Sequence, residues 1–264
     1  MNSNTDNTYY YLSLQCKGVV CSIELNGVVI VEDKTGNGIN ADIPVNAWIM
    51  PSGNVLTMNV YAEISEDNHL ETKLYIHDNE SMRPTPKVTL VETSYPVEPI
   101  GILPLTIPLP ILDEKLEYIP ETKLWSEAEQ IEELSDQDKT ELLSLAESVR
   151  QTMDKKDAAG TYQLLRYRFD DMARADYHSP EKIKEVAIKQ YEWVFDEASS
   201  ETTSEQLTIE NAKFKIAADN KLALLHHETG REAVVFTDPI NQDITAIDIF
   251  ASKINGEWVI TRGL

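Results

Sequence analysis

The residues best suited to acid–base chemistry are two adjacent histidines, His226 and His227. A histidine titrates near neutral pH and acts as a general base when a neighbouring carboxylate orients its ring. The pair lies in an apolar segment that predicts a strand, where adjacent side chains point to opposite faces, so the two rings cannot share one metal ion. Whichever ring points inward could pair with Asp248 on a neighbouring strand. A structural or surface histidine pair is the alternative.

Familiar catalytic and metal-binding motifs are absent from the sequence. There is no G-x-x-x-x-G-K phosphate loop, no G-x-S-x-G elbow and no H-E-x-x-H helix. Cys16 and Cys21 are the only cysteines, too few for a zinc site, and we expect buried free thiols, with a disulfide as the alternative. We therefore expect no metal and no cofactor, and we expect a binding protein more than an enzyme.

Aromatic and polar residues nevertheless suggest two candidate sites. A pocket in the second half of the chain could be lined by residues on helix and strand faces: Tyr162, Arg166, Tyr191, His227 and Asp248. Core packing is the alternative for Tyr162 and Tyr191, because both lie in apolar helical stripes. In the first half, Trp48 and Tyr61 are candidate interface residues, since exposed Trp and Tyr often supply interface energy. A Trp48 buried in a core is the alternative there.

The net charge of −22, from 23 basic and 45 acidic residues, limits the partners. It disfavours nucleic acid and anionic membranes, because both repel an acidic surface. It favours a protein partner with a basic face, reached faster by electrostatic steering, or it only keeps the surface soluble. No apolar run approaches the ~20 residues of a membrane helix, and the polar N-terminus lacks signal-peptide features, so we expect a cytoplasmic protein.

Turn residues organise the first half. Asn26-Gly27 separates two apolar alternating runs and predicts a tight hairpin. Pro51-Ser52-Gly53-Asn54 predicts a second turn before the alternating run Val55–Tyr61. Further short strands follow at the spacing of a sandwich, without a helical segment between them. Residues 1–94 are therefore predicted to form an antiparallel β-sandwich.

This arrangement resembles the galactose-binding-like β-sandwich family. The resemblance rests on Asn26-Gly27, a loop, and Gly53-Asn54-Val55-Leu56 before a strand. It implies the sandwich fold and a domain that binds a ligand, for which a carbohydrate is one expectation. The matching motifs mark turns, so no carbohydrate-binding residue is carried over.

Residues 95–125 have a different composition, in which prolines alternate with aliphatic residues. The prolines exclude a helix, and the apolar residues are unlike a free linker. We expect an extended strap docked along the surface or between domains, with an open recognition segment for a partner as the alternative. The prolines are Pro96, Pro99, Pro104, Pro108, Pro110 and Pro120.

Residues 126–264 are predicted to contain helices followed by antiparallel strands. Ser126, Ser135 and Ser179 are expected helix starts, and Asn255-Gly256 predicts a terminal hairpin before Trp258. The order of elements and the terminal Gly-x-Trp strand resemble the nuclear transport factor 2-like superfamily. That resemblance implies helices packed on a curved antiparallel sheet, often around a pocket.

The predicted fold class is α+β overall, with a sandwich, a strap and a helix-on-sheet domain. The expected function is that of a non-enzymatic acidic interaction protein with a basic protein partner. Its most specific form is a bacterial immunity-type protein that neutralises a basic toxin. The alternative is small-ligand binding or catalysis in the pocket of the second domain.

Overall fold

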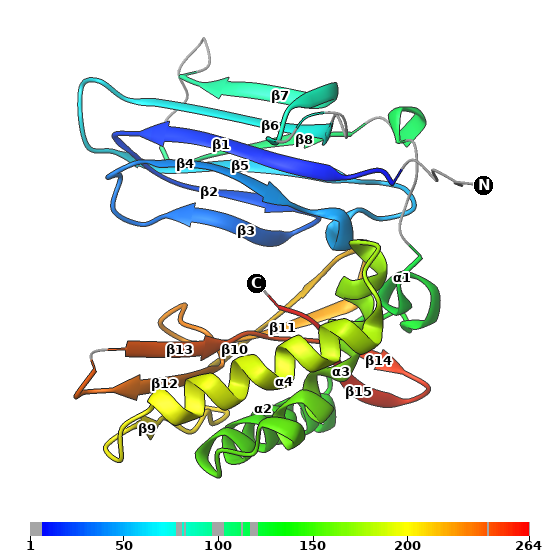
Figure 1. Cartoon of the computed structure of the whole chain (residues 1–264). Helices are drawn as coiled ribbons and strands as arrows, with labels where there is room; N and C mark the ends of the chain where they lie inside the picture. Colours follow the sequence, from blue (N-terminus) through cyan, green and yellow to red (C-terminus); the bar gives the residue numbers. More distant parts are fainter. Residues whose placement is uncertain are drawn as a thin grey trace. The chain divides into compact units, whose positions relative to one another are not determined.

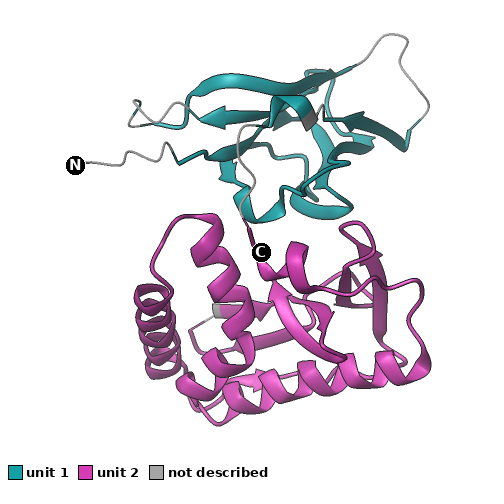
Figure 2. Ribbon diagram, turned by 90° about the vertical axis from the view of Figure 1, so that its right-hand side faces the viewer, with its two compact units in different colours: residues 1–120 teal, residues 121–264 magenta. Residues whose placement is uncertain are grey.

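The computed structural model describes residues 7–77, 81, 83–96, 103–111, 113–116, 121–241 and 243–263. The chain forms two compact units, residues 1–120 and 121–264 (Figure 2). Antiparallel sheets make up the first unit, and helices combine with antiparallel sheets in the second (Figure 1). The predicted α+β class is therefore confirmed.

The first unit is a sandwich of two four-stranded antiparallel sheets. Strands of both sheets bury alternate apolar side chains, such as Leu12 and Leu14 of one sheet and Ile23 and Leu25 of the other. One sheet has the order β4 (Ile39–Pro44), β1 (Tyr10–Lys17), β6 (His69–His77), β7 (Pro86–Tyr95). The other has the order β3 (Val28–Asp33), β2 (Val19–Leu25), β5 (Val55–Glu63), β8 (Leu105–Pro110).

The predicted hairpin at Asn26-Gly27 is confirmed, with φ of 57° and 80° at the two turn residues. The Asn26 side chain also binds the end of the 3-10 helix η1 (Asn46–Trp48): its amide nitrogen donates to the Trp48 carbonyl at 2.8 Å. Its amide oxygen accepts the Val55 N–H at 2.9 Å. One residue therefore forms a turn and fastens a second loop.

The Pro-rich segment contributes strand β8 to the first unit, at the edge of a sheet. The N–H of Ile111 donates to the Asn54 carbonyl beside β5 at 2.9 Å. The backbone N–H groups of successive residues in a strand point to opposite sides, so the nitrogens of Pro108 and Pro110 face away from β5. The two prolines therefore remove no hydrogen bond between β5 and β8. The 3-10 helix η2 (Asp113–Lys115) follows. Residues 97–102, 112 and 117–120 of the expected strap lie outside the described part.

The second unit begins with helices. They are α1 (Lys123–Glu127), α2 (Asp136–Asp154), α3 (Ala158–Ala175) and α4 (Pro180–Glu197). Ser135 caps α2 through a capping box with Asp138, and Ser179 caps α4, as predicted. The predicted start at Ser126 is wrong, because Ser126 lies inside α1, which ends one residue later.

The strands of the second unit form two antiparallel sheets that pack with the helices. A core of apolar side chains joins α2, α3 and the longer sheet, including Leu142, Val149, Leu165, Ile249 and Ile260. The longer sheet has the order β10 (Ala212–Ala217), β11 (Leu222–His227), β14 (Ile249–Ile254), β15 (Glu257–Arg262). The shorter has the order β13 (Asp243–Ile247), β12 (Val234–Asp238), β9 (Thr203–Ser204).

Candidate functional site

The two candidate tyrosines belong to a row of packed aromatic rings. Tyr162 is buried and stacks on Phe169, with ring centroids 5.7 Å apart. Tyr191 meets Phe169 edge-on at 6.5 Å and stacks on Phe195 at 6.2 Å. These contacts join α3 to α4. The rings thus pack between helices, which is the alternative interpretation of their apolar stripes.

Arg166 and Asp248 are not members of that row of rings. Arg166 is exposed, with its guanidinium 5.0 Å from the centroid of the Tyr167 ring. Asp248 is half-buried between β13 and β14. Burial lowers the pKa of Arg168, and the charges of Tyr191 and Asp248 oppose that change. Arg168, which the sequence analysis did not single out, therefore lies within electrostatic reach of both Tyr191 and Asp248.

His227 is buried, but its carboxylate neighbour is not the expected one. Its Nε2 lies 3.5 Å from Oε1 of Glu205, a carboxylate that the sequence analysis did not name. Its Nδ1 accepts the Thr229 N–H at 3.2 Å and lies 2.8 Å from the Thr229 hydroxyl. The adjoining cavity measures about 10 Å³, the room of about one water molecule. This histidine is held in place by its neighbours, without space for a substrate beside it.

The interface candidates of the first unit differ in exposure. Trp48 is 7% exposed, which matches the alternative of a core residue. Tyr61 is 48% exposed, and its hydroxyl lies 2.9 Å from the Ser22 hydroxyl. Of the two, only Tyr61 presents its side chain to solvent.

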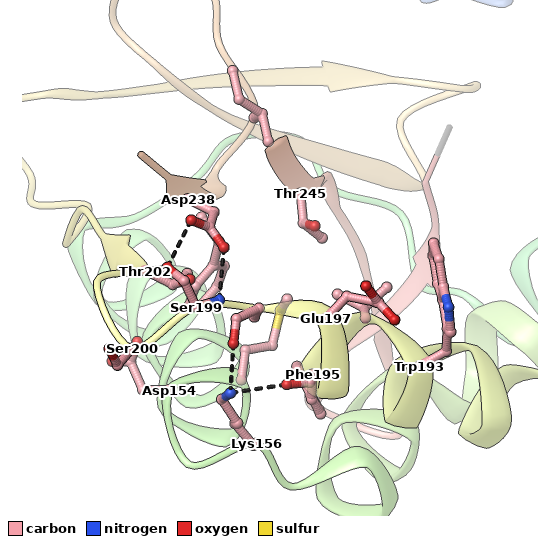
Figure 3. A pocket seen from close by; sticks show the side chains of 15 residues that line it. Asp154, Lys156, Trp193, Phe195, Glu197, Ser199, Ser200, Thr202, Asp238 and Thr245 are labelled. Carbon is pink, nitrogen blue, oxygen red and sulfur yellow. Dashed lines mark hydrogen bonds between the residues drawn. The ribbon is translucent and has the colours of Figure 1, made fainter. Parts of the chain in front are cut away.

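The second unit has a larger pocket, of about 410 Å³, at a place that the sequence analysis did not identify (Figure 3). Its walls come from the C-terminal ends of α2 and α4, the loop after α4, and strands β12 and β13. None of the candidate residues Tyr162, Arg166, Tyr191, His227 and Asp248 lines it. A pocket in the second unit was thus expected, but with different lining residues.

Asp238 organises one end of this pocket. Its carboxylate accepts the N–H and the hydroxyl of Ser199, each at 2.7 Å, and the N–H groups of Ile240 and Asn241 at 3.0 and 3.2 Å. These bonds hold the pKa of Asp238 well below its usual range, led by those from Ser199. The ionised carboxylate therefore fixes the loop after α4 against the turn after β12.

Lys156 organises the floor of the pocket (Figure 3). Its ammonium donates to the carbonyls of Phe195 and Ala198, at 2.8 and 3.0 Å. Phe195 lies in the last turn of α4 and Ala198 is the residue that follows the helix, so the ammonium serves as a C-terminal cap.

Trp193 and Glu197 form the exposed side of the pocket. Trp193 is 64% exposed, and Glu197 is also exposed. Their spacing of four residues puts both side chains on one face of α4, and Figure 3 shows them at the end of the pocket away from Asp238. Trp193 lies two residues after Tyr191, so it falls outside the apolar helical stripe that contains Tyr191. That off-stripe tryptophan was the available sequence signal.

No protein family, no curated protein and no solved structure matches this chain. Within the described residues, no group of three or more His, Cys, Asp or Glu side chains is placed to hold a metal ion. No described helix combines the length and the apolar character needed to cross a membrane.

Proposed function

We propose that this is a non-enzymatic interaction protein whose partner is a protein with a basic surface. The observation that carries the proposal is Trp193, exposed beside Glu197 at the mouth of a 410 Å³ pocket. Exposed tryptophans next to concave surfaces are frequent binding anchors.

The net charge supports the chemistry of this partner. A chain with a net charge of −22 attracts a basic protein over several ångströms and orients it before contact. The most specific form of the proposal is a cytoplasmic immunity-type protein that neutralises a basic toxin. The two family resemblances are part of the same proposal, supported by the Asn26-Gly27 turn in the first unit and by helices that precede a sheet in the second.

The surroundings of the titratable groups support a binding role over a catalytic one. His227 is bonded to Thr229 beside a cavity of about 10 Å³. The carboxylate of Asp238 already accepts several hydrogen bonds from its own loop. Neither group is placed to exchange a proton with a bound substrate.

Small-ligand binding is the second candidate function, and the size of the pocket favours it. A volume of about 410 Å³ lies within the range of roughly 300–1,000 Å³ that is typical of small-molecule sites. Aromatic walls with a few polar groups are also typical of such sites.

The proposal is tested by affinity capture from the lysate of the host organism, at low and at high salt. We expect a basic protein to be retained at low salt and released as salt rises. Trp193→Ala should retain much less of it. Val186→Ala is the matched control, because Val186 is 53% exposed on the same helix and does not line the pocket. Capture of no basic protein at either salt would reject the proposal in favour of small-ligand binding.

A further inference from the structure

We infer that the pocket between the ends of α2 and α4 binds an organic cation, an ammonium or guanidinium group on an apolar stem. This inference rests on the proposed function, since the basic partner would supply the cation as a lysine or arginine side chain. It adds the place and the chemistry of the contact.

The first argument concerns the electrostatic potential at the C-terminal ends of α2 and α4. Asp154 ends α2 and Glu197 ends α4, and both line the pocket. The C-terminus of a helix carries roughly half a negative charge, and proteins usually place basic residues there. Neither helix has a basic residue in its last turn. Because Lys156 already caps the end of α4, the added negative potential comes from the end of α2 and from the carboxylates of Asp154 and Glu197.

The second argument is the balance of charges in the lining. Three carboxylates, Asp154, Asp238 and Glu197, face one ammonium, Lys156, which leaves a formal charge of −2. Asp154 is engaged by Arg150 and by the Ser204 hydroxyl, and Asp238 by its own loop. Glu197 differs from both, because its carboxylate has no hydrogen bond or ion pair within the described part of the chain. It is the acceptor that remains for a ligand.

The third argument is the aromatic surface beside that acceptor. The indole of Trp193 lies one helical turn before Glu197 on the same face of α4. A cation is attracted to the face of an indole ring, and a carboxylate next to that ring adds an ion pair. Ile244 of β13, 69% exposed, gives the stem of the ligand an apolar surface.

The fourth argument is an unused polar atom in the wall. The hydroxyl oxygen of Thr202 is shielded from water and has no hydrogen-bond partner among the described residues. Buried hydroxyls are normally paired, so this one is an acceptor available to a ligand. In Figure 3 Thr202 lies at the Asp238 end of the pocket and Glu197 at the other end, so the two residues offer acceptors at separate places in its wall.

The experiment titrates full-length protein with N-acetyl-arginine amide and N-acetyl-lysine amide, followed by the indole NMR signals. The matched neutral probes are N-acetyl-citrulline amide and N-acetyl-norleucine amide. We expect each cation to bind about tenfold more tightly than its neutral counterpart. Glu197→Gln should remove most of that difference. Glu192→Gln should preserve it, because Glu192 is exposed on α4, outside the lining.

Equal binding of cationic and neutral probes, or a preference that survives Glu197→Gln, would overturn the inference. The capture experiment separates its failure from that of the proposed function. A basic protein retained equally by wild type and Glu197→Gln would leave the proposed function standing and reject the pocket as the contact. Cation binding without any captured protein would reject the proposed function and leave the inference about the pocket standing, with a free organic cation as the ligand.

Discussion

Arg262 and Asp171 form an ion pair of 2.9 Å inside the second unit, with side chains 1% and 0% exposed. The other end of the guanidinium donates to the Thr122 hydroxyl at 2.9 Å. The Asp171 carboxylate accepts the N–H groups of Lys123 and Leu124 at 2.8 and 3.0 Å. A carboxylate of α3 therefore caps the N-terminus of α1, and an arginine of β15 holds that carboxylate in place.

Breaking this pair should be among the most costly single changes in the chain. Arg262→Ala leaves Asp171 buried without its counter-charge, which should lower the free energy of unfolding by about 3–5 kcal/mol. Urea unfolding followed by tryptophan fluorescence measures the loss. Lys189→Ala is the control, since its pair with Glu185 is exposed at 69% and 67% and should be worth less than about 1 kcal/mol. Similar losses for both variants would contradict this assignment.

A pair of asparagines has a comparable role in the first unit. Asn54 is buried, and its amide oxygen accepts hydrogen bonds from the Met50 N–H at 2.7 Å and from the Asn26 amide at 3.0 Å. Its amide nitrogen donates to the Met50 carbonyl at 2.8 Å. Asn54→Ala leaves these groups unpaired and should destabilise the protein by about 2 kcal/mol or more.

The matched control for the asparagine variant is Asn37→Ala, at an exposed loop position. It should change the free energy of unfolding by less than about 0.5 kcal/mol. Thermal unfolding of both variants provides the comparison. A loss at Asn54 no larger than that at Asn37 would show that the loop is held by other contacts.

Asp138 should make the stability of the second unit depend on pH. The Ser135 hydroxyl donates to its carboxylate and, with Lys253 and Trp258, holds the pKa of Asp138 well below its usual range. A depressed pKa contributes stability above the unfolded value of about 4, and that stability declines as pH falls below it. Asp138→Asn should cost about 1–2 kcal/mol at pH 7 and less near pH 3.

Unfolding in urea at the two pH values measures this difference. Asp136→Asn is the control, because it removes the same charge from the same helical turn at a fully exposed side chain. It should have little effect at either pH. If the difference in free energy of unfolding between wild type and Asp138→Asn stayed constant from pH 7 to pH 3, the ionised carboxylate could not be its source.

The two cysteines should be unreactive in the folded protein. Both are free and buried, and burial raises the pKa of Cys21 to about 12 and that of Cys16 above its usual value. The thiolate is the reactive form, so iodoacetamide at pH 8 should label the native protein about a thousandfold more slowly than the unfolded chain. The rate should still rise above pH 9. A plateau near pH 9 would indicate an ordinary, accessible thiol.

Much of the fold was predictable because local chemistry determined it. Asn26-Gly27 and Asn255-Gly256 adopt the positive φ that tight hairpins require, and Ser135 caps α2 through its own neighbours. The start of α1 was missed for the opposite reason. Its amides are capped by Asp171, 48 and 47 residues further along the chain, so no local pattern marks it.

The pocket was only partly predictable for the same physical reason. Its walls meet through tertiary packing of α2, α4, β12 and β13, which sequence spacing alone does not reveal. The candidates Tyr162 and Tyr191 belong to the apolar stripes of their helices, and both pack against the Phe169 ring, as apolar side chains on facing helices normally do. Trp193, which lies outside the stripe of its helix, was the better guide to the pocket.

Strand β8 is the edge strand of its sheet, and the backbone nitrogens of Pro108 and Pro110 point away from the neighbouring strand β5. A strand from a second molecule would find two consecutive donor sites missing, so it could not extend the ladder along this edge. The mutual repulsion of chains that each carry a charge of −22 acts against pairing in the same direction. The prolines of a segment that reads as a connector thus close one sheet edge to further strand pairing.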